Sequence, residues 1–598
     1  MSPSAFNRGA AIHNLTESLE RGESFDLIVI GGGITGAGVT LDAASRGLRT
    51  LLLEQNDFAS GTSSRSSKLV HGGLRYLQQG DIGLVYEALA ERQRLRKNAP
   101  HLVKLLPFLL PIFTKDGLFN RKIAWALGKA MWMYDLTGGA RIGKLHQKLS
   151  TDETLAYMPT LPRQRLAGSY LYYDASTDDA RLTLAVIQTA VEAYEATAIN
   201  FAPVTQFTTT IDSHRPDQHT SSSSNATGKV ESGKAESGAK INGVITEIDG
   251  ERFEIPAKFV VNAAGVWADY IRGLNDHEVG HSIRPAKGVH ISVPWTKVRN
   301  EVAAVIPVRS DRRSIFVVPW GDQTYIGTTD TDYEGPLDDP RCEEEDVEYL
   351  LDAMNASLTE PLSRADVLGT WAGLRPLVRG SENEEGRTAD LSRKHHLSVD
   401  SDQLISINGG KLTTYRRMAE DTVDLVVSLT DDATKSRLHN SARTKSLPLV
   451  GARGYFQFLR QIPAFIAAFE AHGVGTSTAE REDLLVHLAN RYGDRARVLV
   501  AMIEADPSLA TRLHPSHPFV EAEVLYALRY EMAITIEAIL TRRVPLRLHD
   551  SYAAWYSTDR VSDLMAAELG WSEAEQRQEV ASFKELLNSE RESAGFTS

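Results

Sequence analysis

The segment 25–54 constrains the fold more than any other part of the chain. An apolar run, FDLIVI, leads directly into three glycines, and a helix-compatible stretch and a second apolar run (48–53) follow. This order of strand, glycine turn, helix and strand opens a doubly wound parallel sheet, because the right-handed crossover packs the helix back onto the sheet. The glycines fit the pattern Gly31-x-Gly33-x-x-Gly36. The sequence therefore predicts an α/β fold that begins with a Rossmann-type domain.

Each glycine has a separate role in such a turn. Gly31 permits the tight turn, Gly33 lets the backbone approach a pyrophosphate, and Gly36 lets the helix pack on the sheet. The N-terminus of that helix favours an anion through its dipole and its free N–H groups. Glu54 ends the second strand, 18 residues after Gly36, where a carboxylate binds ribose hydroxyls and disfavours a 2′-phosphate. The motif predicts a bound dinucleotide but does not separate FAD from NAD.

Residues 57–76 are dense in hydroxyls, glycines and cations, with the sequence DFASGTSSRSSKLVHGGLRY. Small donors and a flexible backbone suit a loop that lies along an extended dinucleotide and reaches its redox ring. The alternative is a solvated Ser-rich linker. The apolar and basic residues within the stretch argue against that alternative.

Bulk properties exclude several other classes. The length of 598 residues suggests two or three domains, and the formal net charge of -13 disfavours nucleic-acid binding by the molecule as a whole. The single cysteine, Cys342, excludes an intrachain disulfide and a cysteine-rich metal site, so we expect no metal and a reducing cytosol. No uncharged apolar run reaches the roughly 18 residues of a spanning helix. Any membrane contact is therefore expected to be peripheral.

Two regions differ in texture from the rest. Residues 208–240 are rich in Ser, Thr, Gly and Lys and predict a disordered surface loop between two flanking strands. Beyond about residue 440, apolar residues recur at three and four positions, which predicts helices.

The motifs resemble one family. FASGTSSRSSKLVHGGLRYL, followed by EALAERQRLRKNAPHLV, resembles the FAD-dependent glycerol-3-phosphate dehydrogenases, within the wider superfamily related to D-amino-acid oxidase. The resemblance covers nearly the whole chain and includes RYGDRARVLV in the helical part. It continues through KGVHISVP (287–294), IFVVPWGDQTYIGTTDTDY (315–333), WAGLRPLV (371–378) and GGKLTTYRRMAE (409–420).

The resemblance implies FAD as the cofactor and oxidation of sn-glycerol 3-phosphate to dihydroxyacetone phosphate by hydride transfer from C2. Together with the residue patterns above, it predicts an N-terminal extension (1–23), a Rossmann-type FAD-binding domain interleaved with a mixed-sheet substrate domain (24–440), and an all-helical C-terminal domain (441–598). The cofactor residues that the motifs imply are Gly31, Gly33, Gly36, Glu54, Thr62, Ser63, Ser64, Ser66, Ala264, Gly265, Gly410, Lys411, Leu412 and Thr413.

The substrate residues also rest on the resemblance. Arg313 and Arg375 match the family's substrate-binding arginines, whose planar forks can hold two phosphate oxygens. His290 is the first candidate for accepting the hydroxyl proton and His71 the competing one, while Arg313 can stabilise the developing alkoxide. The full set of implied substrate residues is Arg75, Tyr76, His71, Arg313, Arg375 and Lys411.

The segment 94–148 carries eleven lysines and arginines but only two acidic residues. They are interleaved with LLPFLLPIF and IAWALGKAMWMY, a pattern typical of a segment that rests on an anionic bilayer. The alternative is a core helix pair with a solvated basic face. Docking would place the protein on the cytoplasmic face of the cell membrane with a membrane quinone as electron acceptor. A homo-oligomer is compatible with the sequence.

Three alternatives remain open at this point. A glycerol-3-phosphate oxidase would return the electrons to dioxygen and produce hydrogen peroxide. An amine or amino-acid oxidase of the same fold would need a carboxylate clamp in place of paired phosphate arginines. A flavoprotein scaffold or sensor would bind flavin without turnover.

Overall fold

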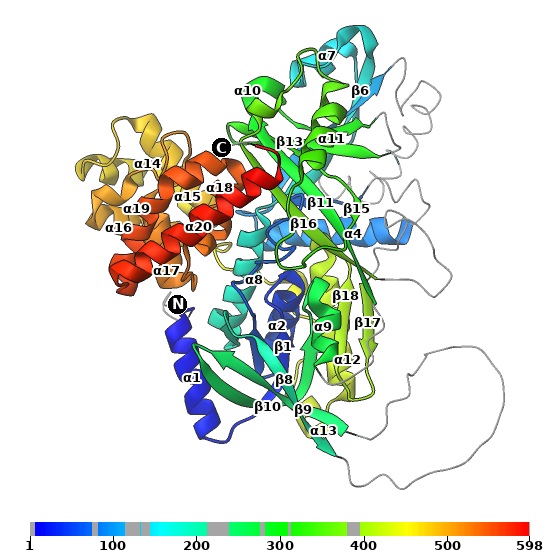
Figure 1. Ribbon diagram of the computed structural model, residues 1–598, viewed down its shortest axis with the longest axis vertical. Coiled ribbons are helices and arrows are strands. Elements are labelled where there is room, and N and C mark those ends of the chain that lie inside the picture. The colour runs from blue at the N-terminus through cyan, green and yellow to red at the C-terminus, as the bar shows by residue number, and fades with distance from the viewer. Residues whose placement is uncertain are drawn as a thin grey trace, which may run out of the picture.

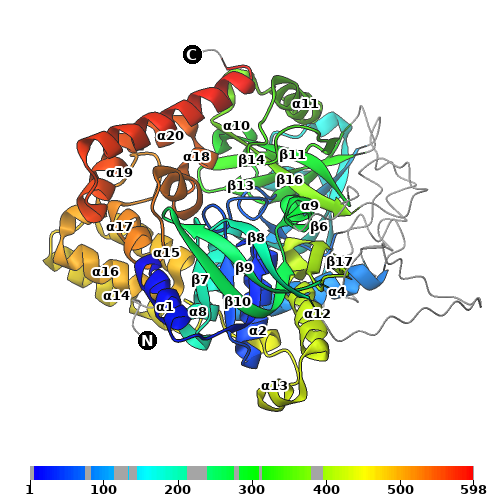
Figure 2. The same ribbon diagram turned by 60° about the horizontal axis from the view of Figure 1, so that its bottom comes forward.

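The computed structural model describes residues 6–73, 82–113, 132, 144–211, 239–274, 282–308, 313–378 and 395–596. In this part of the chain, two sheets stand one above the other along the long axis, and a layer of helices covers one side of both (Figures 1 and 2). The predicted fold class is confirmed.

The first sheet contains the Rossmann-type unit. Its central order is β17-β18-β10-β1-β2-β7, in which β18, β10, β1, β2 and β7 run parallel. Antiparallel β9 extends β10 and pairs with β8. The strands are β1 (Phe25–Ile30), β2 (Thr50–Leu53), β7 (Thr197–Ile199), β8 (Val204–Ile211), β9 (Ala239–Ile248), β10 (Glu251–Asn262), β17 (His395–Val399) and β18 (Ile405–Gly409).

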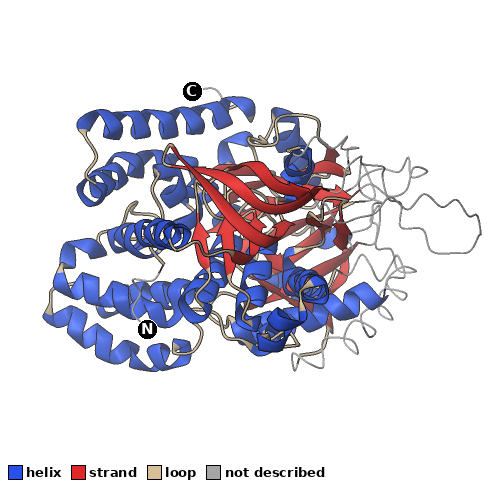
Figure 3. Ribbon diagram, turned by 90° about the horizontal axis from the view of Figure 1, so that it is seen from below, coloured by secondary structure: helices blue, strands red, loops and turns tan. Residues whose placement is uncertain are grey.

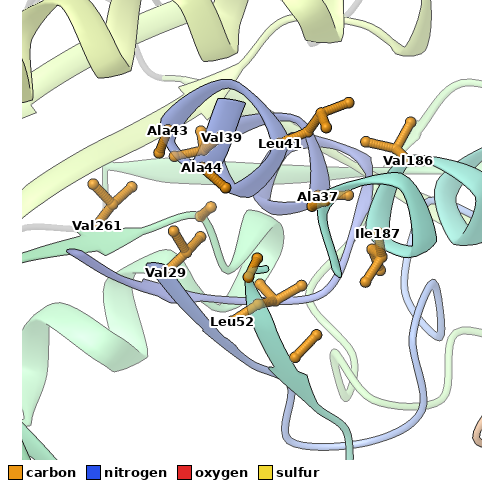
Figure 4. Close-up of a cluster of buried hydrophobic side chains, with 14 of the residues drawn as sticks. Val29, Ala37, Val39, Leu41, Ala43, Ala44, Leu52, Val186, Ile187 and Val261 are labelled. Carbon is orange, nitrogen blue, oxygen red and sulfur yellow. The ribbon is translucent and has the colours of Figure 1, made fainter. Parts of the chain in front are cut away.

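Helix α2 (Ile34–Arg46) crosses from β1 to β2 and is almost entirely buried. It lies against α8 (Asp179–Tyr194) and α12 (Tyr415–Leu429), so apolar side chains on all of its faces are covered. Figure 4 shows this core, in which side chains of α2 meet those of the strands and of α8. The labelled members are Val29, Ala37, Val39, Leu41, Ala43, Ala44, Leu52, Val186, Ile187 and Val261.

The second sheet is mixed and mainly antiparallel, in the order β15-β11-β14-β13-β12-β4-β6-β3, with β16 added to β11 and β5 to β6. The strands are β3 (Leu69–Val70), β4 (Lys104–Phe113), β5 (Gln147–Leu149), β6 (Leu166–Ser176), β11 (Ile283–Pro294), β12 (Ala303–Pro307), β13 (Ser314–Trp320), β14 (Gln323–Gly327), β15 (Thr331–Asp332) and β16 (Gly369–Val378). The other helices of the body are α1 (Arg8–Glu20), α4 (Ile82–Asn98), α7 (Thr151–Tyr157), α9 (Ala268–Gly273), α10 (Trp295–Val298), α11 (Glu344–Asn355) and α13 (Asp432–Arg437).

The C-terminal part is helical, as predicted, and it packs beside both sheets (Figure 3). Its elements are α14 (Tyr455–Ala471), α15 (Thr478–Tyr492), η9 (Gly493–Arg495), α16 (Ala496–Ala505), α17 (Glu521–Tyr530), the π-helix η11 (Ala538–Arg543), α18 (Leu546–His549), α19 (Ser551–Leu569) and α20 (Glu573–Ser593). The domain boundaries given by the sequence stay a prediction.

Two sequence expectations concern surface segments. The strands expected beside the Ser-rich stretch are present as the antiparallel pair β8 and β9, while residues 212–238 lie outside the described residues. For the segment 94–148, the expectation that LLPFLLPIF rests on a bilayer is wrong. That run is β4, which pairs with β6 along its length and buries Phe108, Leu109 and Leu110. No helix in the described part of the chain is long and apolar enough to cross a membrane.

Candidate active site

The glycine turn between β1 and α2 has the predicted geometry. Gly31 has a φ of 108°, which favours glycine, and a Cβ there would lie 2.7 Å from the carbonyl oxygen of Ala263. A Cβ on Gly36 would lie 1.9 Å from the carbonyl oxygen of Gly31. Only glycine therefore lets α2 begin this close to the strand. Gly33 caps the helix, whose first turn borders a cavity.

This cavity, which we call the dinucleotide cavity, spans about 1130 Å³ including the solvent at its open side. It extends from the end of β2 to the turn after β18. The predicted cofactor residues that line it are Gly31, Gly33, Glu54, Thr62, Ser63, Ser66, Ala264, Gly265, Gly410, Lys411 and Leu412. Three others do not: Gly36 lies beneath the turn, Ser64 is buried away from it, and Thr413 lines the adjoining cavity.

Glu54 closes the β2 end of the dinucleotide cavity. Its carboxylate accepts hydrogen bonds from the backbone N–H groups of Gly32, at 2.6 Å, and Asn56, at 2.8 Å. Burial raises the pKa of Glu54, and the two N–H donors oppose this by favouring the charged form. Because Glu54 directly follows β2, its carboxylate lies at the carboxyl edge of the parallel sheet, where a dinucleotide's ribose binds.

The hydroxyl-rich segment contributes in different ways along its length. Ser63 Oγ accepts a hydrogen bond from the backbone N–H of Ile34, at 2.8 Å, in the first turn of α2. Thr62 Oγ1 donates to the carbonyl oxygen of Leu374, at 2.6 Å, which ties the segment to β16 in the second sheet. The Ser64 hydroxyl is buried without a partner among the described residues.

A second cavity, which spans about 900 Å³ including the solvent at its open side, adjoins the first, and we call it the adjoining cavity. Thr62, Ser66, Pro376 and the turn 409–412 line both cavities. These residues form a wall that is common to the two cavities. Four of the predicted substrate residues or bases line the adjoining cavity, namely His71, His290, Arg375 and Lys411. Residues far apart in the sequence therefore meet beside the dinucleotide cavity.

His290 lies on β11 and is 2% exposed. Its Nε2 is 2.8 Å from Ser67 Oγ, and its Nδ1 is buried with no hydrogen-bond partner among the described residues. Burial lowers the pKa of His290 well below its usual value of 6.5, and the positive charges of Arg375 and Lys68 lower it further. The imidazole is therefore neutral at physiological pH.

The orientation of the His290 ring is fixed from both sides. The ring stacks on Trp371 with a centroid distance of 4.8 Å and an interplanar angle of 9°. On β14, a Cβ at Gly327 would lie 2.1 Å from His290 Cδ2, so the ring needs a glycine at that position. Ser67 is in turn held by Tyr325, whose hydroxyl donates to its carbonyl oxygen at 2.8 Å.

Arg375 projects from β16 and is fixed by Asp330. Its Nη1 donates to Asp330 Oδ1 at 2.7 Å, and its Nη2 donates to the carbonyl oxygen of Thr329 at 3.2 Å. A Cβ at Gly288 would lie 2.6 Å from Arg375 Nη2, so the guanidinium passes directly over the glycine of KGVHISV. The guanidinium therefore has a defined position on the cavity wall.

Arg313 has a different environment from Arg375. Its Nη1 donates to the carbonyl oxygen of Asp330 at 2.9 Å, and its guanidinium lies 5.0 Å from the centre of the Tyr349 ring. Arg313 is not among the residues that line the adjoining cavity. Its role in catalysis and substrate binding stays a prediction. Arg75 and Tyr76 lie outside the described residues.

The turn after β18 supplies the wall common to both cavities. Gly409 and Gly410 have φ values of 75° and 73°, and Lys411 follows them. The helix expected near Leu412 begins with the short 3-10 turn η7 (Leu412–Thr414) and continues as α12. Thr413 Oγ1 accepts a hydrogen bond from the backbone N–H of His71 at 3.1 Å, which joins this turn to the segment that follows β3.

Three contributors to the site were not singled out by the sequence. Ser67 and Trp371 orient His290, and Asp330 orients Arg375. All three lie within the motifs quoted above, but no role was predicted for them. The Ser-rich run could have suggested Ser67, whereas the partners of Trp371 and Asp330 lie on other strands. Among the described residues, no three His, Cys, Asp or Glu side chains gather to hold a metal ion.

Comparison with known proteins agrees with this geometry. The family model described as FAD dependent oxidoreductase matches residues 26–410, and the C-terminal domain of alpha-glycerophosphate oxidase matches residues 442–576. Glycerol-3-phosphate dehydrogenase 2 of Mycobacterium tuberculosis (strain ATCC 25618 / H37Rv) is 36% identical over 569 residues, which cover 95% of this chain and 89% of that protein. The chain belongs to the FAD-dependent glycerol-3-phosphate dehydrogenase family.

Other members of this family match over similar lengths. The mitochondrial glycerol-3-phosphate dehydrogenase of Mus musculus is 35% identical over 590 residues, which cover 95% of this chain and 74% of that protein. The crystal structure of glycerol-3-phosphate dehydrogenase from Bacillus halodurans, complexed with FAD, superposes with a TM-score of 0.71 at 30% identity and covers 98% of both chains.

FAD is the cofactor of this family member, and the residues present fit it. The glycine turn leaves room for a pyrophosphate at the N-terminus of α2. The dinucleotide cavity runs from Glu54 to the turn 409–412, where it meets the adjoining cavity. An extended dinucleotide in this cavity would therefore have Glu54 at its ribose and the turn 409–412 at its redox end.

Proposed function

We propose that this protein oxidises sn-glycerol 3-phosphate to dihydroxyacetone phosphate and passes the electrons to a quinone. The observation that carries the proposal is the shared wall of the two cavities, with His290, Arg375 and Lys411 grouped beside the dinucleotide cavity. FAD, when bound, supplies the hydride acceptor. The protein has to hold the substrate and remove a proton.

Two cations support binding of the phosphate group. Arg375 offers a planar guanidinium whose orientation Asp330 fixes, and Lys411 lies on the wall common to both cavities. A charge-assisted contact of this kind holds a phosphate with a defined geometry. A phosphate group held by these two cations would fix the position of the substrate, and its C2 hydroxyl would then lie at a defined distance from the wall common to both cavities.

His290 is the proposed acceptor of the hydroxyl proton. The tautomer that donates from Nε2 to Ser67 Oγ leaves the lone pair on Nδ1, the nitrogen with no described partner. The lowered pKa of His290 keeps the imidazole neutral at physiological pH, which is the form that can accept a proton at Nδ1. His71, on the same cavity, remains the competing base. Stabilisation of the alkoxide by Arg313 is proposed as well, although Arg313 is not among the residues that line the adjoining cavity.

The quinone is the proposed acceptor because relatives that match over nearly the whole chain are named dehydrogenases. Peripheral contact with the cytoplasmic face of the cell membrane is proposed with it. Since β4 is buried, this contact would use the later part of the basic segment, of which residues 144–148 are described. The alternative acceptor is dioxygen.

Anaerobic addition of glycerol 3-phosphate to the purified holoenzyme tests the substrate. We expect bleaching of the visible flavin absorbance, whereas an amine or amino acid should leave it unchanged. Stopped-flow mixing of the reduced enzyme with oxygen or with a soluble quinone then tests the acceptor. Faster reoxidation by the quinone is expected, and faster reoxidation by oxygen would make the protein an oxidase.

A further inference from the structure

The loop after β2, residues 54–68, is held by elements outside the Rossmann-type unit. The part of this loop that lines the dinucleotide cavity consists of Glu54, Gln55, Ser60, Gly61, Thr62, Ser63 and Ser66. Between these lining residues, Asp57 turns away from the cavity and is 1% exposed. Its carboxylate therefore needs partners from elsewhere in the protein.

Those partners are two adjacent arginines of the C-terminal domain. Arg543 donates from Nη1 to Asp57 Oδ2 at 2.5 Å and from Nη2 to Oδ1 at 2.9 Å. Arg542 donates from Nε to Asp57 Oδ2 at 2.6 Å. Asn200 adds a fourth hydrogen bond, from Nδ2 to Oδ1 at 3.1 Å. Although burial opposes ionisation, the two guanidinium groups lower the pKa of Asp57 to about 2.

Both arginines are fixed within the C-terminal domain. They are the last two residues of η11, a π-helix whose six residues are all buried, and π-helical turns are frequent at functional sites. Arg543 Nη2 also donates to the carbonyl oxygen of Glu531 at 2.7 Å, and Arg542 Nη1 donates to Glu537 Oε1 at 2.9 Å. The pair is thus a rigid support on which Asp57 rests.

The residues next to Asp57 contact the pyrophosphate-binding turn directly. The backbone N–H of Ala59 donates to the carbonyl oxygen of Gly32 at 3.1 Å. Phe58 is 0% exposed, and a Cβ on Gly32 would lie 2.7 Å from its ring. A displacement of Asp57 would therefore move the contacts of the glycine turn as well as the loop.

The other end of the loop is fixed independently. Asp179, at the start of α8, accepts hydrogen bonds from Ser66 Oγ at 2.7 Å and from Lys68 Nζ at 2.6 Å. The hydrogen bonds of Asp57 thus tie one end of the loop to the C-terminal domain, and those of Asp179 tie the other end to α8. Asp57 lies three residues before the lining residues at positions 60–63. A change in the position of Asp57 would therefore shift these residues and alter the cavity.

We propose that the C-terminal helical domain is part of the cofactor site, where Arg542 and Arg543 hold Asp57 and thereby keep the loop 54–68 in the conformation that retains FAD. Removing one partner of a buried ion pair leaves an uncompensated charge, which favours conformations that return the carboxylate to water. Those conformations would open the loop. The arginines act as positioning residues through Asp57.

The rate of FAD release from the holoenzyme tests this proposal, followed as the rise in flavin fluorescence after dilution. Arg543→Met is expected to speed the release about tenfold or more, as is typical for loss of an outer support of a binding group. Arg543→Lys should restore part of the effect, because an ammonium keeps the charge but not the forked geometry. Far-UV circular dichroism of the variants should match the wild type.

Arg495→Met is the matched control. Arg495, in η9, pairs with Glu192 of α8 and so joins the C-terminal domain to the body without a contact to the loop. Its FAD release should stay within about twofold of wild type. Wild-type release from Arg543→Met, or equal release from both variants, would overturn the proposal. If Arg543→Met does not fold, Arg542→Gln replaces it, with release about threefold faster expected and an unchanged rate contradicting the proposal.

Discussion

The two cavities are built in different ways. The dinucleotide cavity is lined mainly by backbone, small side chains and hydroxyls, and its only charged lining residues among those described are Glu54 and Lys411. The adjoining cavity gathers basic and titratable side chains from separate strands and loops, including His290, Arg375 and His71. Binding in the first is spread over many weak contacts. Chemistry in the second depends on single side chains, so point substitutions should have unequal effects in the two places.

The largest effect is expected from Arg375→Met. This change removes the fixed guanidinium from the adjoining cavity, and losing a charge-assisted contact to a phosphate should lower kcat/KM by about 10²- to 10³-fold. FAD content should stay at the wild-type level, since Arg375 does not line the dinucleotide cavity. Steady-state kinetics and the flavin absorbance per chain measure the two quantities.

Arg284→Met provides the control for Arg375→Met. Arg284 lies on the paired strand β11 and forms an ion pair with Asp332, but it does not line either cavity. Its kcat/KM should stay within about threefold of wild type. Equal losses in the two variants would show that Arg375 supports the sheet and does not bind the phosphate.

The second effect in size is expected from His290→Asn. Loss of a general base slows the chemical step by about 10²-fold at the lower end of the usual range, and this is the size expected here. Flavin reduction in a stopped-flow experiment isolates this step from reoxidation. His71→Asn, at the competing histidine of the same cavity, should reduce the rate much less. A larger loss in His71→Asn would transfer the role of the base to His71.

A small effect is expected from Ser63→Ala in the dinucleotide cavity. The variant loses one hydrogen bond, from Ile34 N–H, which is worth about 1 kcal/mol, so FAD affinity should fall only several-fold. Ser64→Ala, which removes a buried hydroxyl without a described partner, should leave FAD affinity unchanged. Titration of apoprotein with FAD measures both. If Ser63→Ala lost as much FAD affinity as Arg375→Met loses in kcat/KM, binding in the dinucleotide cavity would depend on a single side chain, and the difference between the two cavities would be contradicted.

The smallest expected effect is that of mild acid on flavin reduction. Because the pKa of His290 is lowered well below 6.5, the ring stays neutral as the pH falls through that value. The reduction rate at saturating substrate should therefore be nearly constant from about pH 8 to about pH 6. An acid limb centred near 6.5 would show that the base is a histidine with an ordinary pKa.

The same contrast explains how much the sequence predicts. Half of the residues that line the dinucleotide cavity come from the segment 30–66, so the turn Gly31–Gly36 and Glu54 reveal both the fold and the site. His290, Arg375 and Lys411, which the resemblance implied, line one cavity, and their roles stay predictions. The resemblance did not distinguish the surroundings of Arg313 from those of Arg375, because Arg313, just before β13, and Arg375, on β16, both donate to Asp330.

The errors and omissions share one physical cause. The run LLPFLLPIF is apolar both as a membrane segment and as the buried strand β4, and only its pairing with β6 decides between them. Likewise, the residues around Asp57 in the sequence do not indicate its partners. Arg542 and Arg543, which bind its carboxylate, lie more than 480 positions away. Long-range pairing has no local signature.

Anaerobic stopped-flow reduction of the holoenzyme by sn-glycerol 3-phosphate carrying deuterium at C2 tests the central claim most directly. The claim is that the adjoining cavity holds this substrate with C2 ready to deliver a hydride to FAD. We expect the flavin absorbance to bleach with either isotope, and more slowly with deuterium, because the C2–H bond breaks in the observed step. Flavin that stays oxidised in the presence of saturating glycerol 3-phosphate would contradict the account.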